Sequence, residues 1–386
     1  MRYTPHHHVP RVAIFHDNFA QMGGAERVAE ALHRALPNAG MFTTLSVTER
    51  LTPYLRALQP RAGWMQLLPW KQRLFRHYFL LYPLAIETVD LRDYDVIVTS
   101  CFGYAKGIRR RSPGSLHICY CHNPMRWVHR GSDYMAGAQM GLLKRTALKL
   151  LLGPLAAWEL RAACQPDVYI ANSKVVQQRL RETFGIDSQV IPPPIETSRF
   201  RIVDEPEGFY LVLSRLVPYK RIELAVEACT RLGRPLKIVG DGIDRKHLES
   251  IAGPTVEFLG RASDEVVNGL VSRCKALLFP GEEDFGITPV EVNAAGRPVV
   301  AYRAGGATET IVDGLTGVFF EAQTTDSLTE AMLRLEAMPW NPRAIRAHAM
   351  RFDTAVFQRR IRAAIEAEQE RRAGAVSADL ATVLTA

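Results

Sequence analysis

Short apolar runs alternate with amphipathic segments along most of the chain. Several of the runs are apolar throughout, which is typical of parallel strands covered on both faces. The predicted strands are Arg11–Phe15, Val96–Thr99, Leu116–Cys121, Val168–Ala171, Phe209–Leu213, Leu236–Val239, Val256–Phe258, Ala276–Phe279 and Pro298–Tyr302. The predicted helices between them are Gly24–Leu36, Lys174–Thr183, Arg221–Leu232, Asp264–Ser272, Val290–Ala295 and Ala307–Asp313. This alternation predicts an α/β protein with doubly wound parallel sheets.

The chain is expected to form two domains. Its 386 residues suit two units of ~150–200 residues each. The prolines at 192–194 cannot continue a strand or a helix, and the polar residues after them predict a linker. We therefore assign residues 1–200 and 201–342 to two Rossmann-like domains, whose strand carboxyl ends would face a ligand-binding cleft. A charged helix is expected over 343–372 and a frayed tail over 373–386.

Composition excludes several classes of protein. Hydrophobic residues make up 47% and charged residues 23%, a globular balance that does not fit a disordered or fibrous chain. We expect no spanning helix and no signal peptide, because the apolar runs are too short. The six cysteines form no CxxC pair, so free thiols in a reducing cytoplasm are expected. Cys119, Cys121 and His122 lack the spacing of a zinc site, and no metal is expected.

Positive charge is concentrated in the first half of the chain. Residues 1–200 carry 25 Lys and Arg against 14 Asp and Glu, whereas residues 201–386 carry 23 against 26. The segments Trp64–Tyr82 and Met140–Ala163 interleave basic residues with aromatic residues and leucines, and the cluster Arg109–Arg111 lies between them. This pattern suits contact with the headgroups of an anionic membrane. The alternative is that both segments form amphipathic helices that pack on their own domain.

Two glutamates eight residues apart follow the predicted strand that ends at Phe279. Glu283 and Glu291 could hold sugar and ribose hydroxyls, because each carboxylate can accept from two donors. Glu291 also has a structural interpretation. With Thr288 as the N-cap, it would occupy the third helical position and complete a capping box.

A basic loop follows the strand Phe209–Leu213. Arg215 and Lys220 lie where a strand ends and a helix begins, which is a position that favours anions. The two cations could clamp a diphosphate and offset the charge that builds on it as it leaves. Alone, this spacing would fit a solvated basic turn; the glutamate pair downstream favours the functional interpretation.

Glycine pairs open two predicted helices. Gly23 and Gly24 follow the first strand and would let backbone N–H groups approach a phosphate. Gly305 and Gly306 repeat this arrangement, although a packing turn explains them nearly as well. Neither pair, nor the GDG sequence at 240–242, completes a GxGxxG pattern, which counts against a dinucleotide-dependent dehydrogenase.

A polar and aromatic cluster, Tyr120–Trp127, lies at another strand end. His122 could contact a transferred sugar, and Arg126 could meet a phosphate. A loop with a structurally satisfied histidine is the alternative. Asp17, after the first strand, is placed with Arg126 and Trp127 on the side of the site that would receive the sugar.

The chain resembles glycosyltransferase family 4 over nearly its whole length. The resemblance rests on the turn Gly23–Gly24, SRLVPYKR at 214–221, GDG at 240–242 and EDFGITPVE at 283–291. YCHNPMRW at 120–127 and YRAGGATETI at 302–311 are similar to bacterial mannosyltransferases of polysaccharide assembly. The resemblance implies the GT-B fold, retention of anomeric configuration, a nucleoside-diphosphate sugar as donor substrate, and neither a metal nor another cofactor.

The resemblance also implies roles for individual residues. Those expected to act in sugar transfer are Arg215 and Lys220 on the diphosphate, Glu283 on the sugar, and His122 beside it. Those expected to bind the donor are Gly23, Gly24, Arg261, Phe285, Gly286, Ile287 and Glu291. The donor would be held mainly by residues 201–342 and the acceptor by residues 1–200, with 343–372 crossing back to the first domain.

The resulting prediction is a metal-independent enzyme that moves mannose from GDP-mannose to a glycan on a polyprenyl diphosphate. It would work at the inner face of the cytoplasmic membrane. Same-face attack is favoured because the sequence offers no carboxylate nucleophile that is free of another role. The alternatives are a UDP-hexose donor, a sugar-nucleotide epimerase of the same fold, and a non-enzymatic membrane-binding protein. Nucleic acid is disfavoured as a partner because no recognised binding motif occurs.

Overall fold

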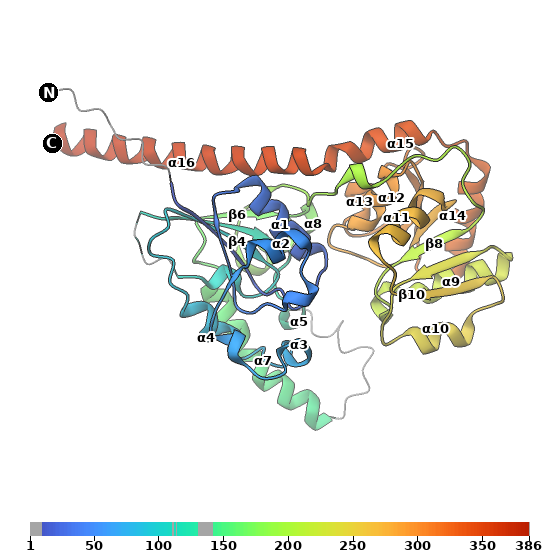
Figure 1. Ribbon diagram of the computed structural model, residues 1–386, viewed down its shortest axis with the longest axis horizontal. Coiled ribbons are helices and arrows are strands. Elements are labelled where there is room, and N and C mark those ends of the chain that lie inside the picture. The colour runs from blue at the N-terminus through green and yellow to red at the C-terminus, as the bar shows by residue number, and fades with distance from the viewer. Residues whose placement is uncertain (1–9, 110–111, 113, 130–141, 386) are drawn as a thin grey trace. The chain divides into compact units, whose positions relative to one another are not determined.

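The computed structural model describes residues 10–109, 112, 114–129 and 142–385. Its backbone divides into two compact units (Figure 1). The first contains the chain up to Asn172, Val176–Ile191 and the residues from Phe357 onward; the second contains Ser173–Val175 and Pro192–Val356. The main change of unit falls at the three prolines, because proline can extend neither a strand nor a helix.

The first unit is built on a seven-stranded parallel sheet with the order β3-β2-β1-β4-β5-β6-β7. Its strands are β1 (Val12–His16), β2 (Gly40–Thr43), β3 (Arg61–Ala62), β4 (Val96–Cys101), β5 (Leu116–Cys121), β6 (Val168–Ala171) and β7 (Gln189–Val190). The order reverses between β1 and β4, and parallel sheets bind ligands beyond the carboxyl ends of the strands at such a switch point.

Helices of the first unit connect these strands. They are α1 (Gly24–Ala35), α2 (Pro53–Leu58), α3 (Lys71–Leu74), α4 (Tyr82–Glu87), α5 (Arg126–His129), α7 (Leu142–Ala162), α8 (Lys174–Phe184) and most of α16 (Thr354–Thr385). Phe357, Ile361 and Ile365 lie on one face of α16 and are buried against the core that includes Ile14 and Leu32. This packing makes the C-terminal helix part of the first unit (Figure 1).

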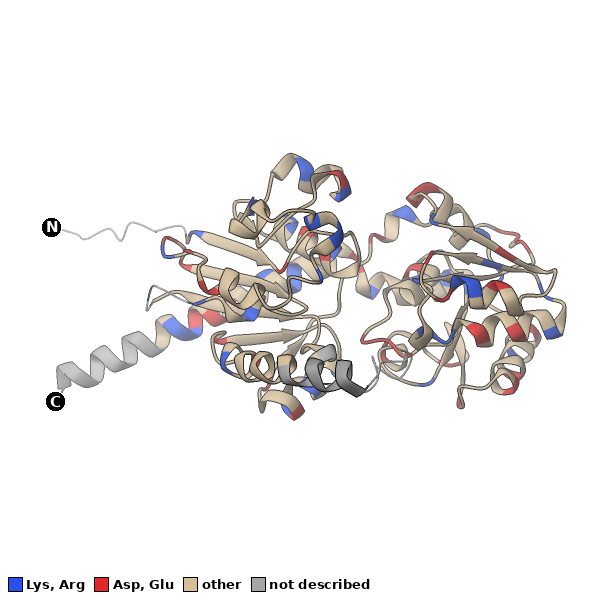
Figure 2. Ribbon diagram, turned by 90° about the horizontal axis from the view of Figure 1, so that it is seen from below, with Lys and Arg blue, Asp and Glu red and all other residues tan. Residues whose placement is uncertain are grey.

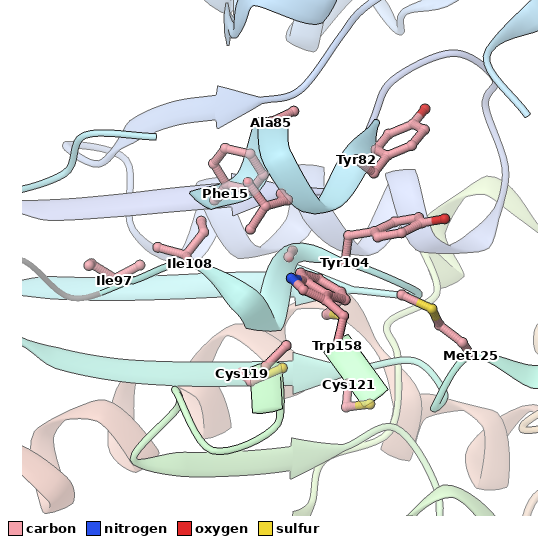
Figure 3. Close-up of a cluster of buried hydrophobic side chains, with 14 of the residues drawn as sticks. Phe15, Tyr82, Ala85, Ile97, Tyr104, Ile108, Cys119, Cys121, Met125 and Trp158 are labelled. Atoms are coloured by element: carbon pink, nitrogen blue, oxygen red, sulfur yellow. The ribbon is translucent and has the colours of Figure 1, made fainter. Parts of the chain in front are cut away.

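An aromatic cluster fills the other face of the first sheet (Figure 3). The rings of Tyr82 and Tyr104 are stacked with their centroids 4.7 Å apart, and the ring of Trp158 lies 5.8 Å from that of Tyr104. Trp158 and Leu155 both belong to α7 and are buried. The second half of the segment Met140–Ala163 therefore packs on its own domain, as the alternative interpretation had it.

The second unit has a six-stranded parallel sheet with the order β10-β9-β8-β11-β12-β13. Its strands are β8 (Tyr210–Leu213), β9 (Leu236–Val239), β10 (Val256–Gly260), β11 (Ala276–Phe279), β12 (Val299–Tyr302) and β13 (Gly317–Phe320). Its helices are α9 (Ile222–Leu232), α10 (Arg245–Ile251), α11 (Asp264–Arg273), α12 (Ile287–Ala294), α13 (Ala307–Thr310), α14 (Thr325–Ala337) and α15 (Pro342–Ala349). The switch point of this sheet lies between β8 and β11. Both sheets are parallel and doubly wound, as predicted.

The structure differs from the prediction in the short edge elements and at the C-terminal end. We did not predict β2, β3, β7 and β13; β3 is exposed, and β7 is only two residues long. The expected helix over 343–372 is two helices, α15 and α16, separated by a 3-10 turn at Met350–Phe352. Residues 373–385, expected to fray, continue α16.

Candidate functional site

The second sheet brings two of the candidate residues, Lys220 and Glu283, together at its switch point. Lys220 ends the 3-10 turn Pro218–Lys220 after β8, and Glu283 lies in the loop after β11. The ammonium of Lys220 and the carboxylate of Glu283 form an ion pair, with 11% and 24% of the two side chains exposed. Because β8 and β11 are neighbours in the sheet, residues far apart in the sequence meet at its carboxyl edge.

The GDG segment at 240–242 supports the loop that carries Lys220. A Cβ on Gly240 would lie 1.8 Å from the carbonyl oxygen of Ser214, and one on Gly242 would lie 2.0 Å from that of Leu216. Any side chain here would push the basic loop away from β9. The segment therefore has a structural role beside the site.

The Gly305–Gly306 turn supports the loop that carries Glu283 in the same way. The backbone N–H of Gly306 donates to the carbonyl oxygen of Glu283 at 2.9 Å. A Cβ on Gly306 would lie 2.2 Å from the Cα of Phe285. This turn is therefore a packing turn, which was the alternative interpretation of the glycine pair.

The start of α12 excludes the capping-box explanation of Glu291. The helix begins at Ile287, and its N-cap is Gly286, which has a φ of +83° that favours glycine. Glu291 is then the fifth helical residue, and Thr288 is not the N-cap. Phe285 is buried against Phe352, with the ring centroids 5.7 Å apart, so its side chain belongs to the core. Its predicted contact with a donor would be made by the backbone alone.

Arg215 and Arg261 lie at the same edge of the second sheet and are exposed. The guanidinium of Arg215 donates to the hydroxyl of Tyr219 at 3.3 Å, in the loop after β8. Arg261 follows β10, two strands away from β8 in the sheet order. Their positions agree with the donor-side assignment and do not test it.

At the switch point of the first sheet, three buried polar side chains form a hydrogen-bonded chain. Nδ1 of His16 lies 3.0 Å from the hydroxyl oxygen of Ser100, which lies 2.9 Å from Nε2 of His122. His16 ends β1, Ser100 is its register partner on β4, and His122 follows β5. We did not predict His16 and Ser100, because the pairing of β1 with β4 cannot be read from the sequence.

The structure gives Asp17 a role different from the predicted acceptor contact. Its carboxylate is fully buried and accepts hydrogen bonds from four consecutive backbone N–H groups, those of residues 102–105, at 2.6 to 2.9 Å. Burial raises the pKa of Asp17, and these donors oppose that effect. With both oxygens engaged, Asp17 shapes the loop after β4, and its contact with an acceptor stays a prediction.

A buried ionic network lies under the cluster Tyr120–Trp127, and we did not predict it. Glu159 of α7 pairs with Lys106 at 2.7 Å and with His129 at 2.7 Å, and accepts from the backbone N–H of Met125 at 2.9 Å. Burial opposes the charge on Glu159, but Lys106 and the hydrogen-bond donors keep its pKa below the usual value. The sequence signal was a single glutamate on an otherwise apolar helix face.

Gly23 and Gly24 begin α1, as predicted, but a carboxylate already lies at this helix N-terminus. Gly23 is the N-cap residue, and its backbone N–H donates to the side chain of Glu26 at 2.9 Å. Because Glu26 already places a negative charge there, the turn has a capping role in this structure. Its contact with a donor phosphate stays a prediction.

The remaining predictions in the first unit concern its basic and aromatic segments. Arg126 and Trp127 open α5, but their side chains lie outside the described part of the structure. Arg110, Arg111 and residues 140–141 also lie outside the described residues. In the second unit, acidic and basic residues are interspersed over the helices (Figure 2). Among the described residues, no group of three or more His, Cys, Asp or Glu side chains could hold a metal ion.

The segment from Trp64 to Leu84 carries exposed apolar and basic side chains, which together are called the 64–84 surface. The indole N–H of Trp64 donates to the hydroxyl of Thr88, and the hydroxyl of Tyr78 donates to the carbonyl oxygen of Pro69. The exposed large apolar side chains of this 64–84 surface are Trp64, Leu67, Trp70, Leu80 and Leu84. Its exposed basic side chains are Arg73 and Arg76. Searched over the described residues, the structure contains no helix long and apolar enough to cross a membrane.

Two family models together match the chain over residues 22–352. The model described as Glycosyltransferase Family 4 matches residues 22–199, and the model described as Glycosyl transferases group 1 matches residues 195–352. The two matches meet close to the prolines at which the structure changes unit. The chain belongs to the family 4 glycosyltransferases.

Several relatives carry the names of glycosyltransferases. An uncharacterized glycosyltransferase of Methanocaldococcus jannaschii is 32% identical over 45% of this chain and 51% of its own length. The human alpha-1,3/1,6-mannosyltransferase ALG2 is 28% identical over 62% of this chain and 64% of its own. A GDP-mannose-dependent phosphatidylinositol monomannoside mannosyltransferase of Mycolicibacterium smegmatis is 29% identical over 45% of this chain and 54% of its own length. The chain thus spans about half to two thirds of the length of these relatives.

Solved glycosyltransferase structures have the same fold. HepE of Anabaena, in complex with UDP and glucose, superposes with a TM-score of 0.69 at 17% identity, covering 93% of this chain and all of that one. Sucrose-phosphate synthase of Thermosynechococcus elongatus gives a TM-score of 0.68 at 18% identity, covering 95% of this chain and all of that one. These likenesses confirm the predicted GT-B fold class.

Proposed function

We propose that this protein is a retaining mannosyltransferase that uses GDP-mannose and a glycan carried on a polyprenyl diphosphate. The observation that carries the proposal is the ion pair of Lys220 and Glu283 at the switch point of the second sheet. A cation and a carboxylate held there match the needs of a nucleoside-diphosphate sugar, which has an anionic end and an end rich in hydroxyls. The mannosyltransferases among the relatives support mannose as the sugar.

In this proposal the donor replaces the ion pair with two separate contacts. The ammonium of Lys220 turns to the diphosphate and Glu283 accepts from sugar hydroxyls, so neither of the partly buried charges loses a partner. Arg215, exposed in the same loop, adds a second cation. As the bond between the sugar carbon and the phosphate oxygen breaks, negative charge grows on the diphosphate, and the two cations stabilise it more than in the ground state.

The acceptor hydroxyl attacks from the face that the leaving group departs from. Its proton passes to the departing phosphate oxygen, so the new bond keeps the original anomeric configuration. This route needs neither a carboxylate nucleophile nor a metal ion. His122, at the switch point of the first sheet, would contact the transferred sugar.

A donor screen tests the proposal first. Thermal unfolding of the purified protein is measured with GDP-mannose, GDP, UDP-glucose, UDP-galactose, UDP-GlcNAc, ADP-glucose and NAD. We expect GDP-mannose and GDP to raise the Tm by a few degrees, because a ligand that binds the folded state alone stabilises it. A rise in Tm with the UDP compounds alone would mean that the donor is a UDP-sugar and not GDP-mannose. Conversion of GDP-mannose without an acceptor would favour an epimerase.

The 64–84 surface is proposed as the contact with an anionic membrane, which would bring the enzyme to its lipid-linked acceptor. Leu67 and Trp70 are 87% and 76% exposed, beside the basic Arg73 and Arg76. Apolar side chains that enter the interface next to Lys or Arg are the features that such a surface requires. The protein would then work at the inner face of the cytoplasmic membrane.

Vesicle sedimentation tests the membrane contact. At low salt we expect binding to vesicles that contain phosphatidylglycerol and little binding to phosphatidylcholine alone. The double variant Leu67→Glu/Trp70→Glu should lose binding, while Ile243→Glu should keep it. Ile243 is 86% exposed in the second unit and serves as a matched control for an exposed apolar side chain. Equal binding by the double variant and the control would remove the 64–84 surface from the proposal.

A further inference from the structure

The loops that carry Lys220 and Glu283 begin beyond the paired part of their strands. The registered pairs of β8 with β11 end at Leu211 and Leu277, before either strand ends. Past this point the two backbones still touch, since a Cβ on Gly281 would lie 2.8 Å from the Cα of Lys220. Contacts outside the strand ladder therefore set the distance between the two loops.

A third segment of the chain joins these loops. Gln323 lies between β13 and α14 and is half-buried. Its side-chain Nε2 donates to the carbonyl oxygen of Pro280 at 2.9 Å, and its Oε1 accepts from the guanidinium of Arg221 at 3.4 Å. Pro280 opens the loop of Glu283, and Arg221 directly follows Lys220. One amide side chain therefore spans both loops of the ion pair.

The amide of Gln323 matches the chemistry of both partners. A guanidinium can only donate and a carbonyl oxygen can only accept, so the group between them must offer one acceptor and one donor. A glutamine amide offers both, and this requirement fixes which way the amide of Gln323 is turned. The guanidinium of Arg221 also donates to the backbone carbonyl oxygen of Gln323 at 3.3 Å, which adds a second contact between these residues.

The backbone of Arg221 adopts a conformation that costs free energy. Its φ is +54°, in the left-handed region that favours glycine. Its guanidinium is held by Glu223 as well as by Gln323. Strained residues of this kind persist where the surrounding structure holds them, and they are concentrated at functional sites. The strain at Arg221 lies next to Lys220, so it points to a demand on where Lys220 is placed.

We infer that Gln323 and Arg221 are positioning residues that keep the loops of Lys220 and Glu283 at a fixed spacing while a donor is bound. The inference rests on the proposed function, in which the donor separates the ion pair. Without a donor, the attraction between Lys220 and Glu283 itself helps to hold the two loops. Once the donor has taken over both charges, that attraction is lost, and the hydrogen bonds through Gln323 still join the loops.

Thermal unfolding with and without GDP-mannose tests the inference first. Gln323→Met keeps the length of the side chain and removes both of its hydrogen bonds. We expect its Tm without donor to lie within a few degrees of wild type. The rise in Tm caused by GDP-mannose should fall by half or more, because binding must then also fix the loops.

Thr325→Val is the matched control for this experiment. The hydroxyl of Thr325 donates to the carboxylate of Glu227, which joins α14 to α9 through a contact that involves neither loop. We expect this variant to respond to GDP-mannose as wild type does. An unchanged response in Gln323→Met, or the same reduction in Thr325→Val, would overturn the inference.

Kinetics separate positioning from a loss of structure. We expect Gln323→Met to raise the KM for GDP-mannose about tenfold and to lower kcat less, since losing one partly buried hydrogen bond has an effect of about this size. A structural defect alone would reduce the amount of active protein, so the apparent kcat would fall while the KM stayed the same. That second result would overturn the inference.

Arg221→Gly supplies an independent variant. Glycine adopts the positive φ without strain but removes the guanidinium that donates to Gln323. We expect a Tm without donor close to that of wild type, together with the weakened response to GDP-mannose seen in Gln323→Met. A normal response would mean that Arg221 takes no part in positioning.

A stability cycle without donor tests the link apart from the proposed function. In Glu283→Gln the ion pair is lost, so the two loops depend more on Gln323. We therefore expect Gln323→Met to lower the Tm more in Glu283→Gln than in the wild-type protein, whereas Thr325→Val should lower it equally in both. Equal losses for Gln323→Met would overturn the inference. A wild-type protein that neither binds nor transfers any sugar donor would contradict the proposed function, while the cycle would still decide the link.

Discussion

Lys220 and Glu283 bring opposite charges into a place where little of either side chain meets water. A buried ion pair contributes little net stability, because the cost of removing both charges from water offsets their attraction. Removing one partner is costly, because the other charge is left uncompensated. The pair therefore fits a site that a charged ligand is meant to enter better than it fits a structural support.

Neutralising either member of this pair should stop sugar transfer. We expect Lys220→Gln and Glu283→Gln each to lower kcat/KM by about 100-fold or more, the scale of one lost preorganised contact to a developing charge. Arg231→Gln is the control, since Arg231 pairs with Asp326 at an exposed place in the same unit. Transfer assays and circular dichroism measure the effect. A Glu283→Gln variant that transfers sugar normally would contradict the role of Glu283.

The neutral, buried His16 predicts how stability depends on pH. The folded-state pKa of about 3 lies below the unfolded value of 6.5, so the unfolded chain binds a proton that the folded chain does not. This contribution to the free energy of unfolding is present above about pH 6.5 and is lost as the pH falls toward 3, by about 1.4 kcal/mol per pH unit.

Denaturant unfolding at several pH values checks the effect of His16. Compared with wild type, His16→Asn should lose less stability between pH 6.5 and 4, because asparagine does not titrate. If the free energy of unfolding fell equally with pH in both proteins, His16 would not be a group that takes up a proton on unfolding.

Side-chain types at strand ends could be predicted from the sequence, but their partners could not. Lys220 and Glu283 were identified because a cation and a carboxylate each follow an apolar strand. Asp17 fits the same pattern, yet its carboxylate binds backbone N–H groups of another loop. No local signal separates these cases, since the partner is chosen by the order of strands in the sheet.

At the scale of elements, the loops of the candidate site are shaped by glycines outside it. The turn at 305–306 touches the loop of Glu283, and the segment at 240–242 touches the loop of Lys220. Both contacts are between backbones, so a side chain cannot move aside to relieve a clash. In the structure, these glycines allow the close approach that positions the two loops.

Adding one methyl group at Gly306 should therefore displace the loop that carries Glu283. In Gly306→Ala the new Cβ would meet the Cα, C and O atoms of Phe285 at 2.2 to 2.4 Å, so the loop of Glu283 must shift. We expect a loss of donor-induced stabilisation and a destabilisation of about 1–3 kcal/mol, the usual range for overpacking.

Gly269→Ala is the matched control for the substitution at 306. Gly269 lies inside α11, and its Cβ would meet nothing closer than the end of Arg273, 3.7 Å away. This change should stabilise the protein by about 0.5–1 kcal/mol. Thermal unfolding with and without GDP-mannose measures both variants. Normal donor binding by Gly306→Ala would show that the loop tolerates displacement.

Element types were predictable where the pattern was long, and helix starts were not. The strands β5 and β11 were predicted with their observed bounds, and β4 was predicted from Val96 but runs two residues further, to Cys101. The helix was predicted over Val290–Ala295, with Thr288 as a possible N-cap. The chain instead begins α12 at Ile287, since Gly286 can adopt the positive φ that the turn requires.

At the scale of the whole molecule, the last helix completes the first unit. Phe357, Ile361 and Ile365 of α16 are buried with residues of β1 and α1. The chain therefore builds the first unit from two segments that are separated by most of the second. Only the charge and helical pattern of this segment could be read from the sequence; its packing partner came from the family resemblance.

Shortening one of these side chains should weaken the first unit selectively. We expect Ile361→Ala to cost about 2–5 kcal/mol, because Ile361 is fully buried in the core. Hydrogen exchange should speed up in β1 and α1 but not in β8 or β11. Arg359→Ala, on the exposed side of the same helix, is the control. Equal loss of protection in both sheets would mean that the two units unfold as one.

The placement of α16 also determines when the first unit can finish folding during synthesis of the chain. A domain made of a continuous segment can fold as soon as it leaves the ribosome, but the first unit here cannot bury Ile14 and Leu32 fully until residue 365 has been made. During synthesis of the second unit, an apolar face of the nascent chain stays uncovered. Truncated products that end before Phe357 would keep that face permanently, which marks them for aggregation or capture by chaperones.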